Sequence, residues 1–289
     1  MAARNGNIKS VGVVGCGAMG GGIAQVCVTH GFDTTVVETD AARLNAGLDR
    51  IRSQLERDVS RGRLDKQRHD RALRRLHGAG TIEDLADRDL IIEAIAEDMD
   101  AKRSLFAAMG RVSSPETILA SNTSSLSLSE LAGASGRPQS VLGLHFFNPP
   151  QALRLVEVIT SSSTSGETID RAMAFCDAID RITVRVQDTP GFIVNRLLVP
   201  FIFDAIRMVE TGVAKAEDVD QGCKVGLNHA MGPLATADLV GLDVLAAIGD
   251  AMFEEYGEPR FKSPTLLRRM VSLGNLGRKS GKGFFEYQG

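Results

Sequence analysis

Short apolar runs alternate with stretches of helical spacing along most of the chain before Asp188. The runs are rich in Val, Ile, Leu and Ala, and their lengths are typical of buried strands. Strands that alternate with helices form a mostly parallel sheet with helices on both faces. We predict strands at residues 8–14, 34–37, 90–95, 117–120, 141–147, 153–159 and 182–186, and helices at 23–29, 101–112 and about 168–180.

The interval 41–76 departs from this alternation, because it contains two highly charged helical stretches that break near Gly62. It is too long and too polar for a simple crossover, so we predict an inserted helical hairpin. The hairpin could be a solvated pair of helices held by surface ion pairs. It could also be a clamp whose Arg57, Arg61 or Arg63 contacts an anionic ligand. The pattern by itself favours the solvated pair.

Strand patterns stop at the turn sequence 188–191, and the remainder has helical spacing to about residue 273. Breaks in this helical spacing fall at Gly212, 226–233 and 259–264. We therefore predict a Rossmann-type doubly wound α/β domain at 1–189, which contains the hairpin, and an all-helical domain at 190–289.

Composition excludes several classes of protein. The 289 residues are 43% apolar and 24% charged, which is ordinary for a globular protein and unlike disordered, collagen-like or disulfide-rich chains. A net charge of −3 gives no general attraction for nucleic acid or anionic membranes, so we expect neither as a partner. The four cysteines form no CxxC pair and the histidines no HExxH motif. We expect a cytoplasmic protein with free thiols and no metal site.

The segment 15–20 reads GCGAMG and matches the GxGxxG pattern of dinucleotide-binding proteins. It lies between a predicted strand and a predicted helix, where the amides of Gly15, Gly17, Ala18, Met19 and Gly20 can hold a pyrophosphate. Glu38 ends the second strand and can accept hydrogen bonds from an adenosine ribose diol. A carboxylate there repels a 2′-phosphate, which favours NAD over NADP, although the nearby Arg43 could weaken that preference. FAD and S-adenosylmethionine proteins share the pattern, so it does not name the reaction.

Polar groups also follow or interrupt the later strands. Ser124 comes soon after the strand at 117–120, and its hydroxyl could equally cap a helix or contact a ligand. His145 ends an apolar run, where it could exchange protons or be a hydrogen-bonded core histidine. Glu157 interrupts another apolar run, and a buried carboxylate there would need a partner such as His145. Glu157 could instead project outward from an edge strand.

An ordered set of segments resembles the L-3-hydroxyacyl-CoA dehydrogenase family, in particular its short bacterial members that act on 3-hydroxybutyryl-CoA. The resemblance covers nearly the whole chain. Its segments are 13–20 (VVGCGAMG), 92–97 (IEAIAE), 120–126 (ASNTSSL), 142–149 (LGLHFFNP), 155–159 (LVEVI), 190–196 (PGFIVNR) and 281–287 (GKGFFEY).

The resemblance implies NAD-dependent oxidation of the 3-hydroxyl of an acyl-CoA, and the reverse reduction. It assigns a catalytic pair to His145 and Glu157, a substrate hydrogen bond to Ser124, and a further site residue to Asn195 at the start of the helical domain. The site would then lie between the domains. The resemblance also places Asn122, Glu97 and Lys102 near the nicotinamide end of NAD, its ribose or the adjacent substrate.

The resemblance also changes the interpretation of the hairpin, because the corresponding insertion of the family contacts CoA. We expect Arg61 to lie near the CoA phosphates. Members of the family are commonly homodimers through the helical domain, and the apolar faces of 192–209 and 239–253 would form that contact here.

Two departures from the family bear on specificity. Where the family usually has NPVPVMKLVEV, residues 148–158 read NPPQALRLVEV, so the choice of acyl group could differ. Glu38 replaces the more common aspartate, which retains the carboxylate but leaves open how strictly the protein prefers NAD to NADP.

Alternatives are the same chemistry on an acyl group held by an acyl carrier protein, or on a hydroxy or sugar acid. A non-catalytic dinucleotide-binding protein is disfavoured, because it would not need Ser124, His145, Glu157 and Asn195 together.

Overall fold

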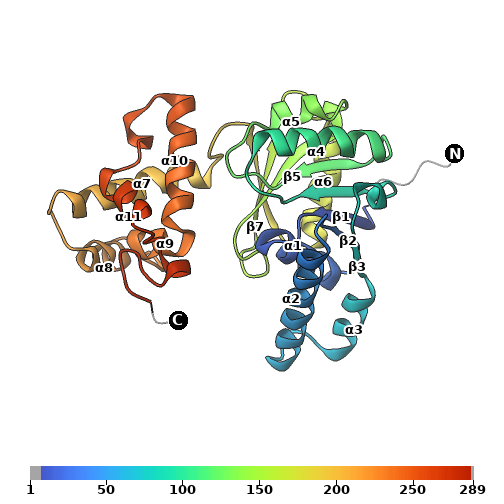
Figure 1. The fold of residues 1–289 in the computed structure, drawn as a ribbon, viewed down its shortest axis with the longest axis horizontal. Helices are drawn as coiled ribbons and strands as arrows, with labels where there is room; N and C mark the ends of the chain where they lie inside the picture. Colours follow the sequence, from blue (N-terminus) through green and yellow to red (C-terminus); the bar gives the residue numbers. More distant parts are fainter. Residues whose placement is uncertain (1–7, 288–289) are drawn as a thin grey trace. The chain divides into compact units, whose positions relative to one another are not determined.

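The structure, a computed structural model, describes residues 8–287 and divides into two compact units, Met1–Asp188 and Thr189–Gly289. The first unit is built around a sheet, and the second consists of helices joined by short loops (Figure 1). Each unit has a hydrophobic core of its own.

The sheet of the first unit has eight strands in the order β3-β2-β1-β4-β5-β6-β7-β8. Neighbouring strands run parallel except β6 and β7, which are antiparallel. The central strands are apolar and buried on both faces, as parallel sheets covered by helices require. The strands are β1 (Ser10–Val14), β2 (Asp33–Val37), β3 (Leu76–Ala79), β4 (Leu90–Glu93), β5 (Ile118–Ser121), β6 (Val141–Phe146), β7 (Leu155–Thr160) and β8 (Ile182–Gln187).

Helices cover both faces of this sheet, which confirms the predicted fold class. Figure 1 shows α4 and α5 on one side of the strands, and α1 with α2 on the other. Phe32, just after α1, packs edge-on against Phe175 of α6 with 5.0 Å between ring centroids. The helices are α1 (Ala18–Thr29), α2 (Ala41–Ser60), α3 (Lys66–Arg74), α4 (Met99–Val112), α5 (Leu128–Ala134) and α6 (Gly166–Ala178), with 3-10 turns at Ile82–Leu85 and Pro138–Ser140.

The inserted hairpin is formed by α2 and α3, which extend away from the sheet (Figure 1). Each helix begins at an aspartate whose side chain accepts a hydrogen bond from the first turn, Asp40 for α2 and Asp65 for α3. Between them the chain turns at Gly62, which has a φ of +68°. Glycine adopts this left-handed conformation at little cost, so it is well suited to end a helix.

The largest differences from the predictions in the first unit are the start of one helix and two elements that were missed. α1 begins at Ala18 rather than at 23, because Gly20, Gly21 and Gly22 lie inside the helix, where they pack closely against neighbouring chain. The edge strand β3 was not predicted, because only Leu76 of its four residues is buried and no apolar run marks it. Helix α5 was not predicted either, since it is short and follows a Ser-rich loop.

The second unit packs five helices and two 3-10 turns around one apolar core. The predicted breaks at Gly212, 226–233 and 259–264 are confirmed, and a further break falls at Gly241, which has a φ of +105°. The apolar sequence on both sides of Gly241 hides this break from a hydrophobic pattern. The helices are α7 (Val194–Glu210), α8 (Ala216–Gly226), α9 (Pro233–Val240), α10 (Leu242–Tyr256) and α11 (Thr265–Ser272), with turns at Pro259–Phe261 and Arg278–Ser280. Across residues 8–287, no helix is both long enough and apolar enough to cross a bilayer.

Candidate active site

The glycine loop connects β1 to α1 and leaves the first turn of the helix open. Gly15 has a φ of +99°, and a Cβ on it would lie 2.7 Å from the carbonyl oxygen of Ala94. A Cβ on Gly20 would lie 2.0 Å from the carbonyl oxygen of Gly15, so glycine is required for this close packing. A Cβ on Gly17, the N-cap residue, would meet nothing within 4 Å, and no side chain caps the helix there. The free amides of Ala18 and Met19 in the first turn can therefore hold an anion.

Beside this loop is a cavity of about 480 Å³ that Glu38, Arg43 and Arg50 also line. Glu38 follows β2 directly, so its carboxylate lies at the carboxyl edge of the sheet, next to the loop. An open helix N-terminus, a glycine at the point of closest approach and the adjoining cavity fit a dinucleotide.

Helix α2 packs against the glycine loop, a contact that was not predicted from the sequence. Nη2 of Arg50 donates a hydrogen bond to the carbonyl oxygen of Cys16 at 2.7 Å. A Cβ on Gly47 would lie 2.0 Å from Sγ of Cys16, so α2 approaches the loop as closely as a glycine allows. A glycine in the middle of a charged helix was the only sequence signal of this contact.

His145 and Glu157 face each other across the single antiparallel pair of strands in the sheet. They are register partners on β6 and β7, and Nδ1 of His145 lies 2.7 Å from Oε2 of Glu157. His145 is 4% exposed and Glu157 is fully buried. The carboxylate therefore points into the protein, and of the two orientations that the sequence left open the structure has the inward one.

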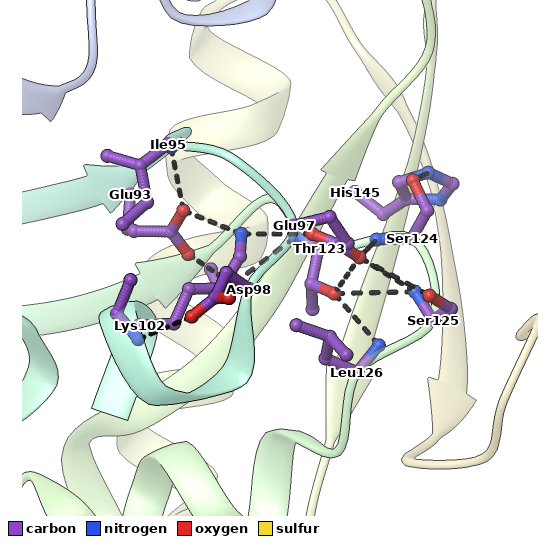
Figure 2. A network of polar contacts seen from close by, with 12 residues as sticks. Glu93, Ile95, Glu97, Asp98, Lys102, Thr123, Ser124, Ser125, Leu126 and His145 are labelled. Atoms are coloured by element: carbon purple, nitrogen blue, oxygen red, sulfur yellow. Dashed lines mark hydrogen bonds and ion pairs between the residues drawn. The ribbon is translucent and has the colours of Figure 1, made fainter. Parts of the chain in front are cut away.

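Ser124 lies beside the same imidazole (Figure 2). Its Oγ is 3.2 Å from Nε2 of His145. The N-cap of α5 is Ser127, whose hydroxyl accepts a hydrogen bond from the amide of Glu130, so Ser124 does not cap this helix. The structure thus brings Ser124, His145 and Glu157 into one hydrogen-bonded chain.

The loop that carries Ser124 is held by Glu97. Oε1 of Glu97 accepts hydrogen bonds from Oγ1 of Thr123 at 2.5 Å and from the amide of Ser124 at 2.9 Å (Figure 2). Burial alone would raise the pKa of Glu97. The charge of Lys102 and these hydrogen bonds outweigh burial, so the pKa lies below its ordinary value.

Lys102 and Asn122 lie deeper than Glu97. Nζ of Lys102 lies 2.7 Å from Oε1 of Glu93 and 3.1 Å from Oε2 of Glu97, and its side chain is 1% exposed. Asn122 follows β5, and its Oδ1 accepts a hydrogen bond from the amide of Phe146 at 2.9 Å, so it ties the ends of β5 and β6 together. No role was predicted for Glu93, although a carboxylate that ends an apolar strand was a signal.

A second cavity, of about 880 Å³, lies among α1, the hairpin and the loop after β6, and arginines dominate its charge. Arg63 lines it and is held by Asp58, with 2.5 Å between Nη2 and Oδ1. Arg61 also lines it and forms no ion pair within residues 8–287.

Asn195 belongs to the second unit, in the first turn of α7, and its assignment remains a prediction.

Family models identify the chain. The model of the 3-hydroxyacyl-CoA dehydrogenase NAD-binding domain matches residues 10–189, and the model of the C-terminal domain matches residues 191–287. The chain belongs to the 3-hydroxyacyl-CoA dehydrogenase family. It is thus an oxidoreductase of this family, with an NAD-binding domain of the family's type, as the resemblance predicted.

Relatives in this family match over almost their full length. A 3-hydroxybutyryl-CoA dehydrogenase of Mycobacterium tuberculosis is 48% identical over 282 residues, which are 97% of this chain and 99% of that protein. The crystal structure of FadB2 from M. tuberculosis superposes with a TM-score of 0.96 at 48% identity, covering 98% of this chain and all of that one. (S)-3-hydroxybutyryl-CoA dehydrogenase PaaH1 from Ralstonia eutropha gives a TM-score of 0.94 at 36% identity, with 98% of this chain and 100% of that one covered.

Proposed function

We propose that this protein interconverts a short-chain L-3-hydroxyacyl-CoA and its 3-ketoacyl-CoA, with NAD as the cofactor and 3-hydroxybutyryl-CoA as the substrate. The observation that carries the proposal is the hydrogen-bonded chain of Ser124, His145 and Glu157. General acid-base chemistry on an alcohol needs a base held in one tautomer and a second group on the reacting oxygen. The names of the relatives at 36–48% identity support the short acyl chain.

His145 is the base in this proposal. In the neutral imidazole, a proton on Nδ1 that faces the Glu157 carboxylate leaves Nε2 as the acceptor, so Nε2 can take a proton from the 3-hydroxyl of the substrate. Glu157 then stabilises the imidazolium that forms. Because Glu157 is fully buried, its charge acts on His145 with little screening by water.

Ser124 orients the reacting oxygen. Its hydroxyl lies 3.2 Å from Nε2, so a substrate oxygen that meets both groups is fixed relative to the base. Bound NAD supplies the acceptor for the hydride that leaves C3. The chain holds the two ends of that cofactor with the glycine loop and Glu38 at one end, and with Asn122 and Glu97 at the other. Asn195 is a further substrate contact in this proposal, and only the resemblance of segment 190–196 to the family supports it.

Two cavities support the choice of cofactor and carrier. Glu38 lines the cavity beside the glycine loop, where a carboxylate favours the free 2′-hydroxyl of NAD over the phosphate of NADP. Arg61 lines the cavity at the hairpin, where an arginine that forms no ion pair with any described residue suits a phosphate of CoA. In this proposal the hairpin is a clamp rather than only a solvated pair of helices.

The first test is the initial rate of acetoacetyl-CoA reduction by the purified protein, with NADH and NADPH in parallel. We expect rapid oxidation of NADH and a much slower rate with NADPH. Dominance of NADPH would contradict the role of Glu38. Failure with both nucleotides, together with activity on an acetoacetyl group attached to acyl carrier protein, would contradict CoA as the carrier.

A further inference from the structure

The end of β4 carries a fully buried carboxylate, Glu93, which has no part in the function proposed above. Its Oε1 accepts hydrogen bonds from Nζ of Lys102 at 2.7 Å and from the amide of Ile95 at 2.8 Å. Its Oε2 accepts one from the hydroxyl of Ser121 at 2.6 Å. A buried carboxylate is costly unless it is paired and hydrogen-bonded, and both of these oxygens are engaged.

Lys102 connects Glu93 to the loop that carries Ser124. Its ammonium lies between Glu93 and Glu97, and it is shielded from solvent. One oxygen of Glu97 contacts Lys102, while the other receives Thr123 and the amide of Ser124 (Figure 2). Lysine has a long and flexible side chain, so the direction of its ammonium depends on the carboxylates around it. Glu93 is the fully buried one of these two carboxylates and therefore the fixed one.

We propose that Glu93 and Lys102 are positioning residues, which hold the Glu97 carboxylate in place and through it set the Ser124 hydroxyl against His145. This inference rests on the proposed function in one respect, because it takes Ser124 as the group that orients the reacting oxygen. It does not require Lys102 to touch either the cofactor or the substrate.

A merely structural role would also join these residues, since Glu93 and Ser121 connect the ends of β4 and β5. The two roles differ in what they predict. Loss of a structural tie lowers the free energy of unfolding and leaves the properties of the folded enzyme unchanged. Loss of a positioning contact lowers kcat in the folded enzyme and loosens the loop at 122–126, while KM changes little.

The test substitutes Glu93→Gln, which removes the charge and keeps the size. We expect kcat for acetoacetyl-CoA reduction to fall about tenfold, as loss of one charge-assisted contact predicts, with both KM values within about twofold. Asp100→Asn is the matched control, because it makes the same change at an exposed position of α4. A folded Glu93→Gln enzyme with the kcat of the wild type would overturn the proposal. If that variant cannot be purified, Glu93→Asp replaces it, because aspartate keeps the charge but draws it back from Lys102. A folded Glu93→Asp enzyme with the kcat of the wild type would then overturn the proposal.

Thr123 allows a test of the contact between Glu97 and the loop that carries Ser124. Thr123→Val removes the hydroxyl that donates to Glu97, and Thr123→Ser retains it. We expect Thr123→Val to lower kcat and Thr123→Ser to restore most of it. If both residues act through Glu97, the double variant with Glu93→Gln loses less than the product of the single losses. Losses that multiply fully would show independent effects and contradict the proposal.

Hydrogen exchange separates this inference from the proposed function. Amides in 122–126 should exchange faster in Glu93→Gln than in the wild type, whereas amides of the glycine loop should not. Inactivity of the wild-type protein with acetoacetyl-CoA would contradict the proposed function. The exchange rates at 122–126 would still test the positioning role of Glu93. Unchanged exchange at 122–126 would defeat the positioning role even in an active enzyme.

Discussion

His145 uses its two ring nitrogens for different purposes. Nδ1 contacts the buried carboxylate of Glu157, while Nε2 meets the hydroxyl of Ser124. Glutamine at 145 is similar in size but cannot accept a proton near neutral pH. We expect His145→Gln to lower kcat by about 10²- to 10⁴-fold, the usual contribution of a general base. Steady-state rates measure the loss, and fluorescence titration of NADH is the control, because its affinity should not change. A variant with wild-type turnover would remove His145 from the mechanism.

Glu97 predicts a dependence of stability on pH. Its pKa in the folded protein lies below the ordinary value of 4.5, so the folded state favours the charged form. The stability that this carboxylate adds is complete above its pKa in the unfolded chain, and it is lost as the pH falls through the lower folded value. We expect Glu97→Gln to destabilise the protein at pH 7, and this difference to shrink below about pH 4.5. Urea unfolding at several pH values measures it, and a difference independent of pH would contradict the assignment.

Single residues differ in how far sequence predicts them. His145, Glu157 and the glycine loop stood out because polar or flexible residues interrupt apolar runs. Whether His145 meets Glu157, and whether Ser124 caps a helix, depended on strand direction and on where α5 begins, which local patterns do not determine. Glu93 was missed because its partner, Lys102, lies on the following helix and becomes buried only in the folded protein.

Most strands of the sheet were predicted from their apolar runs, including the largely exposed β8, whereas β3, which lacks such a run, was missed. β1, β4, β5 and β6 are apolar runs covered on both faces, so composition alone marks them. β3 lies at the edge beside β2, where pairing rather than side-chain burial holds it. The start of α1 was placed too late because three glycines, which disfavour helices in isolation, lie inside it. Close packing decides their conformation, and close packing is a tertiary property.

Helix α2 links the hairpin to the nucleotide loop through Gly47. A Cβ there would lie 2.0 Å from Sγ of Cys16, so Gly47→Ala must push the helix away from the loop. We expect a loss of about 1–3 kcal/mol in the free energy of unfolding, the range for overpacked sites, together with weaker NADH binding. Gly133→Ala is the control, because it is also a helical glycine but its Cβ would meet nothing within 4 Å. Unfolding in urea and NADH titration report the two effects, and equal behaviour of the two variants would refute the close contact.

At the scale of the whole molecule, exposed apolar side chains are distributed unevenly. Of the twelve large ones exposed among residues 8–287, ten belong to the second unit. They include Leu197 on α7 and Leu239 on α9, within the two stretches from which the sequence predicted a homodimer contact. Exposed apolar side chains are typical of positions that another subunit covers. We therefore propose a homodimer formed through this unit.

Charge on this surface should separate the subunits. We expect the wild-type protein to sediment as a dimer, and Leu197→Glu to sediment as a monomer at the same concentration, because a carboxylate cannot be buried there without a partner. Ile182→Glu adds the same charge to an exposed apolar position of the first unit, and it should leave the dimer intact. A wild-type monomer, or a dimer that survives Leu197→Glu, would be incompatible with a contact at Leu197.

The reversal of direction between β6 and β7 has a consequence for how such a protein changes over evolutionary time. Because these strands are antiparallel neighbours, His145 and Glu157 are register partners only twelve positions apart in the chain. A parallel pair would have needed a long crossover to join them. The two residues are thus inherited within one short segment. The sequence of the connection between β6 and β7 can change while the hydrogen bonds between the two strands keep His145 opposite Glu157. The sequence at 150–154, which departs from the one usual in the family, changes the surroundings of a pair that the two strands hold opposite each other.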